Sequence, residues 1–330
     1  MIHIPIRVAG DVWANPQETQ ALLSSADPAQ IWQLDLGAEG PSLTALGVVD
    51  MVTKRCQEIN KPLDSILVSG WFNFQDRVAF SRDYSSPRPI SHFFWRSEEY
   101  SSSRYTPCPD ARKFALFVGR RTFARCRMIY DLWHEFRDQS VLSLMRTTQK
   151  LPWNDNIPVI NLERYADWVQ DQERLEFESW WSQDPVGSID GYDVMDQYVD
   201  QPRTNWNIIQ YYGQFHVEIV AETYTIGPCF FTTEKTIRPI VAGKPMLIYG
   251  PRGYLANLRD LGFRTWHDHW DESYDRYEGP ERWHRIKQSM RDINISDIDP
   301  SITQHNQDRV AELIKEYSPT KPFLHDSENH

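Results

Sequence analysis

The chain alternates short apolar runs with longer segments in which apolar residues recur at helical spacing. Such runs are typical of buried parallel strands, and such spacing is typical of amphipathic helices. In the first hundred residues, strands are predicted at 2–10, 31–37 and 65–70, and helices at 16–26 and 42–59. This order predicts βαβ units on a parallel sheet.

A second alternating set follows residues 82–110, a stretch rich in Ser, Pro and Arg that predicts an interdomain linker. Two helices of this set are expected to end at Gly243 and Gly262, because glycine adopts the left-handed conformation that closes many helices. Strands are predicted at 113–119, 140–146, 215–223 and 245–250, and helices at 120–136, 168–181, 234–243, 253–262, 281–293 and 307–317. The pattern predicts two doubly wound, Rossmann-like α/β domains, residues 1–108 and 109–330, with the last helix able to pack back on the first domain.

Composition narrows the classes of protein that fit. The net charge of −11 and the pI of about 5.4 disfavour a nucleic-acid partner, because an acidic surface repels phosphates. The 4 cysteines form no CxxC pair and are expected to be free thiols in a reducing compartment. The sequence shows no signal-peptide pattern and no apolar stretch long enough for a membrane span, so we expect a cytoplasmic location.

Two predicted strand-to-helix junctions carry basic side chains. In open parallel sheets, ligands bind beyond the carboxyl ends of the strands, where helix N-termini offer N–H groups to anions. At the first junction, Gly119 permits a close turn, and Arg120, Arg121 and Arg125 lie in the loop and the first turns of the helix. We expect this junction to face an anionic ligand.

The second junction, FFTTEKTIRPI, combines a helix cap with charged residues. Thr232 or Thr233 can cap the helix, and Glu234, Lys235 and Arg238 occupy its opening turns. A lysine at a helix start is unfavourable unless an anion binds there, because the helix dipole is already positive at that end. The junction therefore predicts a phosphate site, with solvent-facing charges on an ordinary helix as the alternative.

Together these residues resemble the α1,3-fucosyltransferases, whose fold is of the GT-B type. The donor motif of that family reads as a strand ending in glutamate, an aromatic-bearing loop, Thr-Glu-Lys, a helix, a turn with proline and an apolar strand ending in glycine. The same order appears here at closely similar spacing in Glu222, Phe230, Phe231, Thr233 to Lys235, Ala242 to Pro245 and Met246 to Gly250. Ala124 and Arg125, followed by Tyr130 and Leu132, match a second element, and the resemblance covers about a fifth of the chain, residues 112–130 and 215–265.

The resemblance implies a GT-B-like fold with a cleft between two domains, and an inverting transfer that requires no metal or other cofactor. It implies that Arg125 and Lys235 bind the donor diphosphate and stabilise its departure, and that Glu234 contacts the ribose. Phe230 or Phe231 would line the base. Further donor-site residues indicated by the motif and the junctions are Gly119, Arg120, Glu222, Thr233 and Arg238.

The partners implied are a nucleotide sugar, with GDP-fucose as the first choice, and a hydroxyl-bearing acceptor such as a glycan. The family carries an asparagine after the strand glutamate, and this chain has Thr223 there, which leaves the base and the sugar open. The proton of the acceptor hydroxyl needs a general base. Glu98 is our nominal choice, with Glu99 and Asp76 as alternatives; each can equally be a solvated loop carboxylate.

Two acidic segments are candidate metal sites. The segment from His267 to Glu272 fits no standard zinc spacing. Asp297 and Asp299 spell the DxD of metal-dependent transferases, but they follow the predicted sheet and are interpreted as a turn or helix start. The chain contains no P-loop, GxGxxG or GxSxG motif, which disfavours kinases, dehydrogenases and hydrolases.

Two other functions stay open at this point. One is transfer of a sugar to a modified DNA base, as in some phage GT-B enzymes, which the acidic charge disfavours. The other is a non-catalytic protein that binds nucleotide sugars or glycans, because the first domain carries no recognisable acceptor motif.

Overall fold

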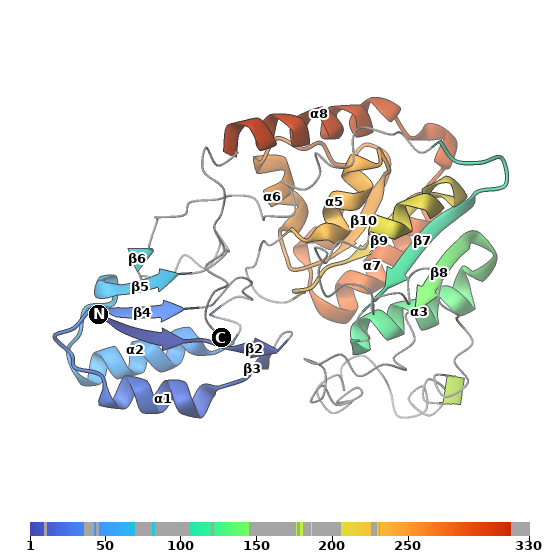
Figure 1. Cartoon of the computed structure of the whole chain (residues 1–330). Helices are drawn as coiled ribbons and strands as arrows, with labels where there is room; N and C mark the ends of the chain where they lie inside the picture. Colours follow the sequence, from blue (N-terminus) through green and yellow to red (C-terminus); the bar gives the residue numbers. More distant parts are fainter. Residues whose placement is uncertain are drawn as a thin grey trace.

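The computed structural model describes residues 1–9, 12–35, 43, 46–69, 81–82, 106–119, 122–144, 176, 179–180, 186, 206–225, 230 and 232–317. These residues form an α/β protein with two four-stranded parallel sheets (Figure 1). The predicted α/β class with parallel sheets is therefore confirmed.

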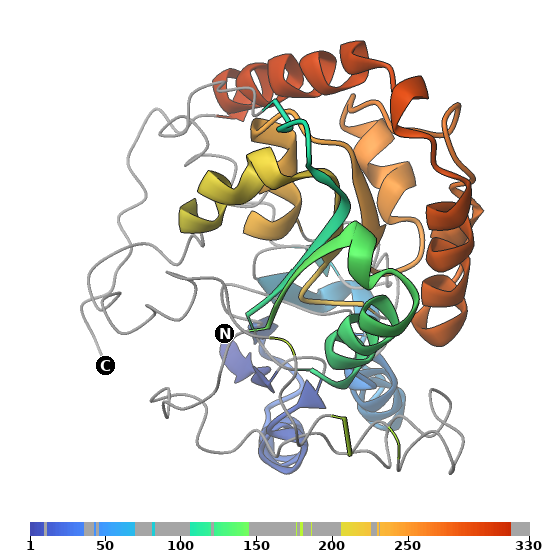
Figure 2. The same cartoon turned by 90° about the vertical axis from the view of Figure 1, so that its right-hand side faces the viewer.

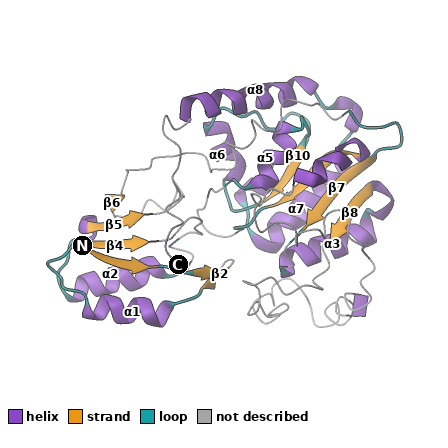
Figure 3. Cartoon of the chain, viewed as in Figure 1, coloured by secondary structure: helices purple, strands orange, loops and turns teal. Residues whose placement is uncertain are grey.

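The first sheet has the strand order β1-β4-β5-β6, and each neighbouring pair is parallel. Its strands are β1 (Ile2–Pro5), β4 (Trp32–Asp35), β5 (Ile66–Ser69) and β6 (Ser81–Arg82), with α1 (Pro16–Ser25), α2 (Val48–Glu58) and the short helix η1 (Leu63–Ser65) between them. The helices α1 and α2 cover one face of the sheet (Figure 3). Trp32 and Leu34 are fully buried against Leu23 of α1 and Val52 of α2.

The prediction of one strand over residues 2–10 is wrong in detail. The chain leaves the sheet after Pro5 and forms a small antiparallel pair, β2 (Val8–Ala9) with β3 (Val12–Trp13). Pro5 is the last residue of β1 to pair with β4. The apolar pattern continues across this break, so the sequence pattern does not show where β1 ends.

The second sheet has the order β10-β9-β7-β8, again with parallel pairs throughout. Its strands are β7 (Arg112–Val118), β8 (Ser140–Leu144), β9 (Phe215–Ala221) and β10 (Met246–Tyr249). Phe114 and Leu116 pack into one core cluster, whereas Ala115 and Phe117 pack into another. Successive side chains of a strand point to opposite faces, so β7 is covered on both sides, which explains its continuous apolar run.

The helices around this sheet match most of the predicted ranges. They are α3 (Phe123–Glu135), α5 (Glu234–Val241), α6 (Tyr254–Asp260), α7 (Gly279–Asp292) and α8 (Pro300–Tyr317), with short helices η3 (Arg137–Gln139), η6 (Trp206–Gln214), η7 (Ser273–Arg276) and η8 (Ile295–Asp297). The predicted helix at 168–181 lies mostly outside the described residues. None of the described helices is long and apolar enough to cross a membrane.

The last helix packs on the second sheet's own helices. Along its described residues, α8 runs beside α5 and α6, as both views show (Figures 1 and 2). The Gln307 side chain donates to the carbonyl of Val241 at 2.7 Å, and Arg309 donates to the carbonyl of Leu261 at 2.7 Å. Ile302, Val310 and Leu313 belong to the core of this half of the molecule.

Both predicted glycine helix ends are confirmed. Gly243 has a φ of 65°, its N–H donates to the carbonyl of Ile240, and the N–H of Lys244 donates to the carbonyl of Pro239. Gly262 closes α6 by the same pattern with a φ of 88°. These paired bonds satisfy carbonyls that the last helical turn leaves without a partner. A Cβ at Gly262 would also lie 2.8 Å from Nε of Arg309, so any other residue would have to displace this side chain as well as adopt the positive φ.

Candidate functional site

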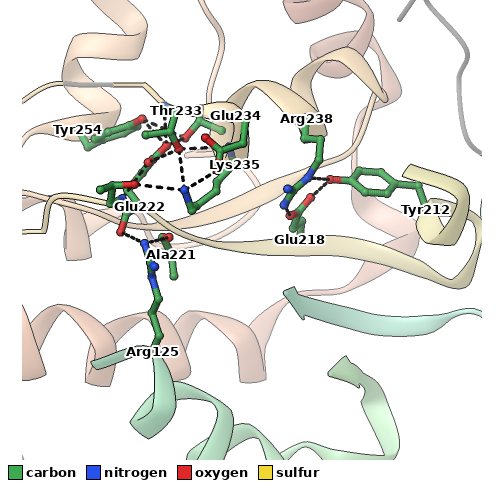
Figure 4. A network of polar contacts seen from close by, with 12 residues as sticks. Arg125, Tyr212, Glu218, Ala221, Glu222, Thr233, Glu234, Lys235, Arg238 and Tyr254 are labelled. Atoms are coloured by element: carbon green, nitrogen blue, oxygen red, sulfur yellow. Dashed lines mark hydrogen bonds and ion pairs between the residues drawn. The ribbon is translucent and has the colours of Figure 1, made fainter. Parts of the chain in front are cut away.

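The strand order of the second sheet reverses beside β7. From β7 the chain passes through α3 to β8 on one side, and it later returns to β9 on the other side. In doubly wound sheets, ligands bind at such a reversal, beyond the carboxyl ends of the two central strands. The site residues predicted from sequence that lie here are Arg125, Glu222, Thr233, Glu234 and Lys235, which we call the switch-point cluster (Figure 4).

Glu222, the residue after β9, organises this cluster. Its carboxylate is buried and accepts hydrogen bonds from the N–H groups of Thr223 and Thr233, at 3.1 and 3.2 Å. It also accepts from the hydroxyls of Thr233, Thr236 and Tyr254. These five hydrogen-bond donors satisfy the Glu222 carboxylate, which a buried charge requires, and no cation among the described residues contacts it. Glu222 thereby fastens the start of α5 and the start of α6 to the end of β9.

Lys235 lies in the first turn of α5, and its side chain is partly accessible. Its Nζ donates to Glu234 Oε1 at 2.6 Å and to the hydroxyls of Thr223 and Thr233 at 3.2 and 3.3 Å. The Lys235 side chain is 18% exposed. An incoming anion can therefore reach this ammonium by replacing the Glu234 carboxylate.

Glu234 is the ion-pair partner of Lys235. Burial by itself would raise the pKa of the Glu234 carboxyl, but the Lys235 ammonium and its hydrogen bond outweigh burial and hold that pKa below its usual value. The carboxylate form is thus the stable one at neutral pH. Thr233 caps α5 in front of this pair, because its hydroxyl accepts from the N–H of Lys235 at 3.2 Å.

Arg125 reaches the cluster from α3, as the sequence predicts, but with a structural contact. Its Nη2 donates to the carbonyls of Ala221 and Glu222 at 3.1 and 2.8 Å, and the residue is 4% exposed. The guanidinium therefore joins the N-terminal part of α3 to the carboxyl end of β9. These two elements flank the reversal in strand order.

The remaining predicted donor-site residues fall into three groups. Gly119 follows β7 directly, as expected. Phe230 is buried and packs edge-on against Tyr254, with ring centroids 5.1 Å apart, so it contributes to the core beside the cluster. Glu98, Arg120 and Phe231 lie outside the described residues, as do the alternatives Asp76, Glu99 and Arg121.

Arg238, also predicted as a donor-site residue, lies in a separate buried group. Its Nε donates to the Tyr212 hydroxyl at 3.1 Å, and its Nη2 donates to Glu218 Oε1 at 2.8 Å. The Tyr212 hydroxyl donates to Glu218 in turn (Figure 4). We call these three residues the buried triad, since none of them exceeds 2% exposure. Arg238 thus holds α5 against β9 and does not face the switch-point cluster.

Burial dominates the electrostatics of the triad. Burial raises the pKa of the Glu218 carboxyl, which Arg238 only partly offsets, and burial together with the Glu218 charge raises the pKa of the Tyr212 hydroxyl. Nearby, Lys244 donates from Nζ to the carbonyl of Phe215 at 2.9 Å. Burial lowers the pKa of Lys244 from 10.5 to about 8.

The two acidic segments that are candidate metal sites have structural roles. Glu272 accepts from the N–H of Trp266 and the hydroxyl of Thr265, at 2.8 and 2.7 Å, and pairs with Arg259. Asp299 accepts from the N–H and hydroxyl of Ser301 at the start of α8, so its interpretation as a helix start is confirmed. Across the described ranges, no three His, Cys, Asp or Glu side chains converge as metal ligands would.

Several residues that complete these groups were not found from the sequence. Tyr254 and Thr236 bind Glu222 from α6 and α5, and nothing in their local pattern distinguishes them from other helix residues. Glu218 did carry a signal, because it interrupts the apolar strand FHVEIVA. A carboxylate in a strand buried on both faces needs a partner, and that requirement could have directed attention to Arg238.

Comparison of the chain with protein-family models, with curated proteins and with solved structures finds no match.

Proposed function

We propose that this protein is an inverting glycosyltransferase of the GT-B type, which moves a sugar from a nucleoside-diphosphate donor to a hydroxyl acceptor without a metal. The observation that carries the proposal is the place of Lys235: a partly accessible side chain in the first turn of a helix, at the reversal in strand order. The helix dipole repels a cation at this end of a helix, so a lysine is unfavourable there unless an anion binds to it. The ordered resemblance to the fucosyltransferase donor motif supports the same ligand.

In this proposal the donor diphosphate takes over Lys235 Nζ from the Glu234 carboxylate. The 2.6 Å contact joins a lysine side chain that is 18% exposed to a glutamate side chain that is 11% exposed, so the exchange requires new hydrogen-bond donors for the Glu234 carboxylate. Glu234 then becomes available to accept hydrogen bonds from the ribose hydroxyls. Arg125 acts mainly by fixing the end of β9, from which Glu222 and Thr223 project.

The chemical step forms a bond between the acceptor oxygen and the anomeric carbon while the bond from that carbon to the diphosphate oxygen breaks. Negative charge grows on the departing diphosphate, and the Lys235 ammonium stabilises it. A carboxylate accepts the acceptor's proton. Glu98 stays our prediction for that base, and GDP-fucose stays the first donor to test.

The experiment is a calorimetric titration with GDP, UDP, ADP and CDP. We expect one diphosphate to bind the unaltered protein and Lys235→Met to weaken that binding at least tenfold. Lys287→Met is the matched control, because Lys287 is 14% exposed and likewise pairs with carboxylates, Asp131 and Glu135. Absence of binding by every diphosphate, or equal binding by Lys235→Met, contradicts the proposal.

A transfer assay then separates an enzyme from a binding protein. The diphosphate that binds is supplied as its nucleotide sugars, and release of the diphosphate is followed with a panel of glycan acceptors. Turnover that requires Lys235 supports the transferase. Tight binding without turnover on the whole panel would favour the non-catalytic alternative.

A further inference from the structure

A pocket of about 650 Å³ lies on the far side of α6 from the switch-point cluster. It is lined by the loop after β10, by the outer face of α6 and by residues of the segment 267–276. Tyr254 of α6 points inward and donates to Glu222, whereas Ala256 and Arg259 of the same helix are exposed and line the pocket. Helix α6 therefore lies between the pocket and the switch-point cluster.

The carboxylates of the pocket wall are engaged by protein groups. Glu272 pairs with Arg259 and also accepts from Thr265. Asp275 pairs with the fully buried Arg282 at 3.0 Å. Asp271 accepts from the N–H and hydroxyl of Ser273, which, with smaller contributions from nearby arginines, lowers the pKa of its carboxyl.

Two arginines of the wall have no such engagement. Arg252 and Arg276 are exposed, and neither guanidinium group makes a hydrogen bond or a contact ion pair with any residue in the described part of the chain. Both line the pocket, and the exposed His267 lies in the same wall. Because Glu272 pairs with Arg259 and Asp275 pairs with Arg282, the charges of the wall without a paired partner are Arg252 and Arg276 against the single carboxylate of Asp271, a small excess of positive charge in a protein with a net charge of −11.

The backbone that carries these two arginines is rigidly braced. The N–H of Gly253 donates to the carbonyl of Asp275 at 2.8 Å, so Arg252 and Arg276 each adjoin one end of the same hydrogen bond. The fully buried Arg282 donates to the carbonyls of Ile248 and Pro251 beneath them. The backbone positions of the two arginines are therefore fixed relative to each other, and their exposed side chains can adjust to a ligand in the pocket.

We propose that this pocket binds the phosphate monoester of a small polar molecule, with Arg252 and Arg276 as its phosphate ligands. A guanidinium group presents paired N–H donors that match phosphate oxygens, and two of them balance a group of charge about −2. The pocket volume leaves room for a sugar-sized body beside the phosphate. This site is distinct from the proposed diphosphate site and does not depend on it.

The test uses the full chain and a hexose 6-phosphate, titrated calorimetrically at low salt. The altered protein is Arg252→Gln with Arg276→Gln. The matched control is Arg264→Gln with Arg291→Gln, which removes the same charge from exposed arginines outside the pocket lining, where Arg264 contacts Ser301 and Arg291 pairs with Glu135. The unphosphorylated hexose, the corresponding hexuronate and inorganic phosphate are titrated in parallel.

We expect the hexose 6-phosphate to bind the unaltered protein and the control, and to bind at least tenfold more weakly when Arg252 and Arg276 are replaced. Lys235→Met should leave this binding unchanged, so its result is distinguishable from that of the diphosphate experiment. No binding, equal binding by the altered protein, or equal binding of the unphosphorylated hexose overturns the proposal. Tighter binding of the hexuronate than of the phosphate also overturns it, in favour of a carboxylate site.

Discussion

Strand β9 and the residue after it carry two glutamates whose surroundings differ. Glu218, within the strand, meets Arg238 and Tyr212 in a group that water does not reach. Glu222, just past the strand's carboxyl end, receives five hydrogen bonds and lies beside a partly accessible lysine. Both groups use the same strand and the same helix, α5.

The contrast indicates that the position of an ion pair relative to the end of β9 helps to distinguish a structural pair from a candidate ligand-binding one. Arg238 and Lys235 are three positions apart on α5 and look equivalent in the sequence. Their depth relative to the end of β9 distinguishes them, because ligands approach a parallel sheet from beyond its strand ends. Arg238, below that edge, braces the fold, and in our proposal Lys235, which is at the edge and partly exposed, exchanges its anionic partner.

The largest effect is expected from Arg238→Met, which leaves the Glu218 carboxylate buried without its cation. Removing one member of a buried ion pair costs about 3–5 kcal/mol of folding free energy. Urea denaturation measures this loss. The double variant Glu218→Gln with Arg238→Met should recover part of the stability, because no uncompensated charge remains. A loss below about 1 kcal/mol in the single variant would refute a bracing role.

A second effect should appear in the pH dependence of Lys244→Met. The pKa of Lys244 is about 8 in the folded protein and 10.5 in the unfolded chain, so the unfolded state binds more protons between these values. Stability of the unaltered protein therefore rises with pH across this window, by about 3 kcal/mol from this residue. Lys244→Met lacks that rise. Denaturation at pH 7 and pH 10 measures it, and Lys54→Met, at an exposed position on α2, is the control.

Parallel pH profiles for the unaltered protein and Lys244→Met would contradict this assignment. They would mean that the ammonium is hydrated where the structure has it buried against Phe215. The comparison with Lys54→Met removes effects that come only from changing the net charge.

The smallest effect on stability is expected from Lys235→Met. The Lys235 and Glu234 side chains are 18% and 11% exposed, against 2% and 1% for Arg238 and Glu218, so water can partly replace the lost ammonium, and the hydrogen bonds to Glu222 remain in place. The pKa of Glu234 is depressed in the folded state, so the pair stabilises the protein at neutral pH and this contribution is lost as the pH falls through that pKa. Melting temperatures at pH 7 and pH 4 check this. A loss as large as that of Arg238→Met would erase the distinction between the two groups.

The sequence predicted the local elements well where local chemistry decides them. The apolar runs located β7 and β9, and Gly243 and Gly262 marked helix ends because glycine adopts the positive φ required there at the lowest cost. The start of α8 was missed, since the helix begins at Pro300, before the apolar spacing becomes regular. Proline is well suited to the first turn of a helix, so Pro300 itself marks the start of α8 in the sequence.

The site was predictable only in part, because its chemistry depends on contacts between distant segments. Glu222, Thr233, Glu234 and Lys235 do meet, as their order along one βα unit implies. The position of Arg238 was not predictable from α5 alone, since Tyr212 and Glu218 determine it. The arrangement of Arg252 and Arg276 depends on a backbone hydrogen bond between Gly253 and Asp275, which no sequence motif predicts.

The reversal in strand order also has a consequence for folding. Arg125 and the carbonyl of Ala221, which it binds, are 96 residues apart along the chain, and β7 pairs with β9 across a similar separation. Parallel pairing over such distances forms slowly, because loop closure precedes any stabilising contact. During translation, the switch-point cluster cannot assemble until β9 and α5 have left the ribosome. Ligand binding at the switch-point cluster would therefore report that the chain has been made at least through α5, and a nascent chain that ends before β9 would not bind the ligand.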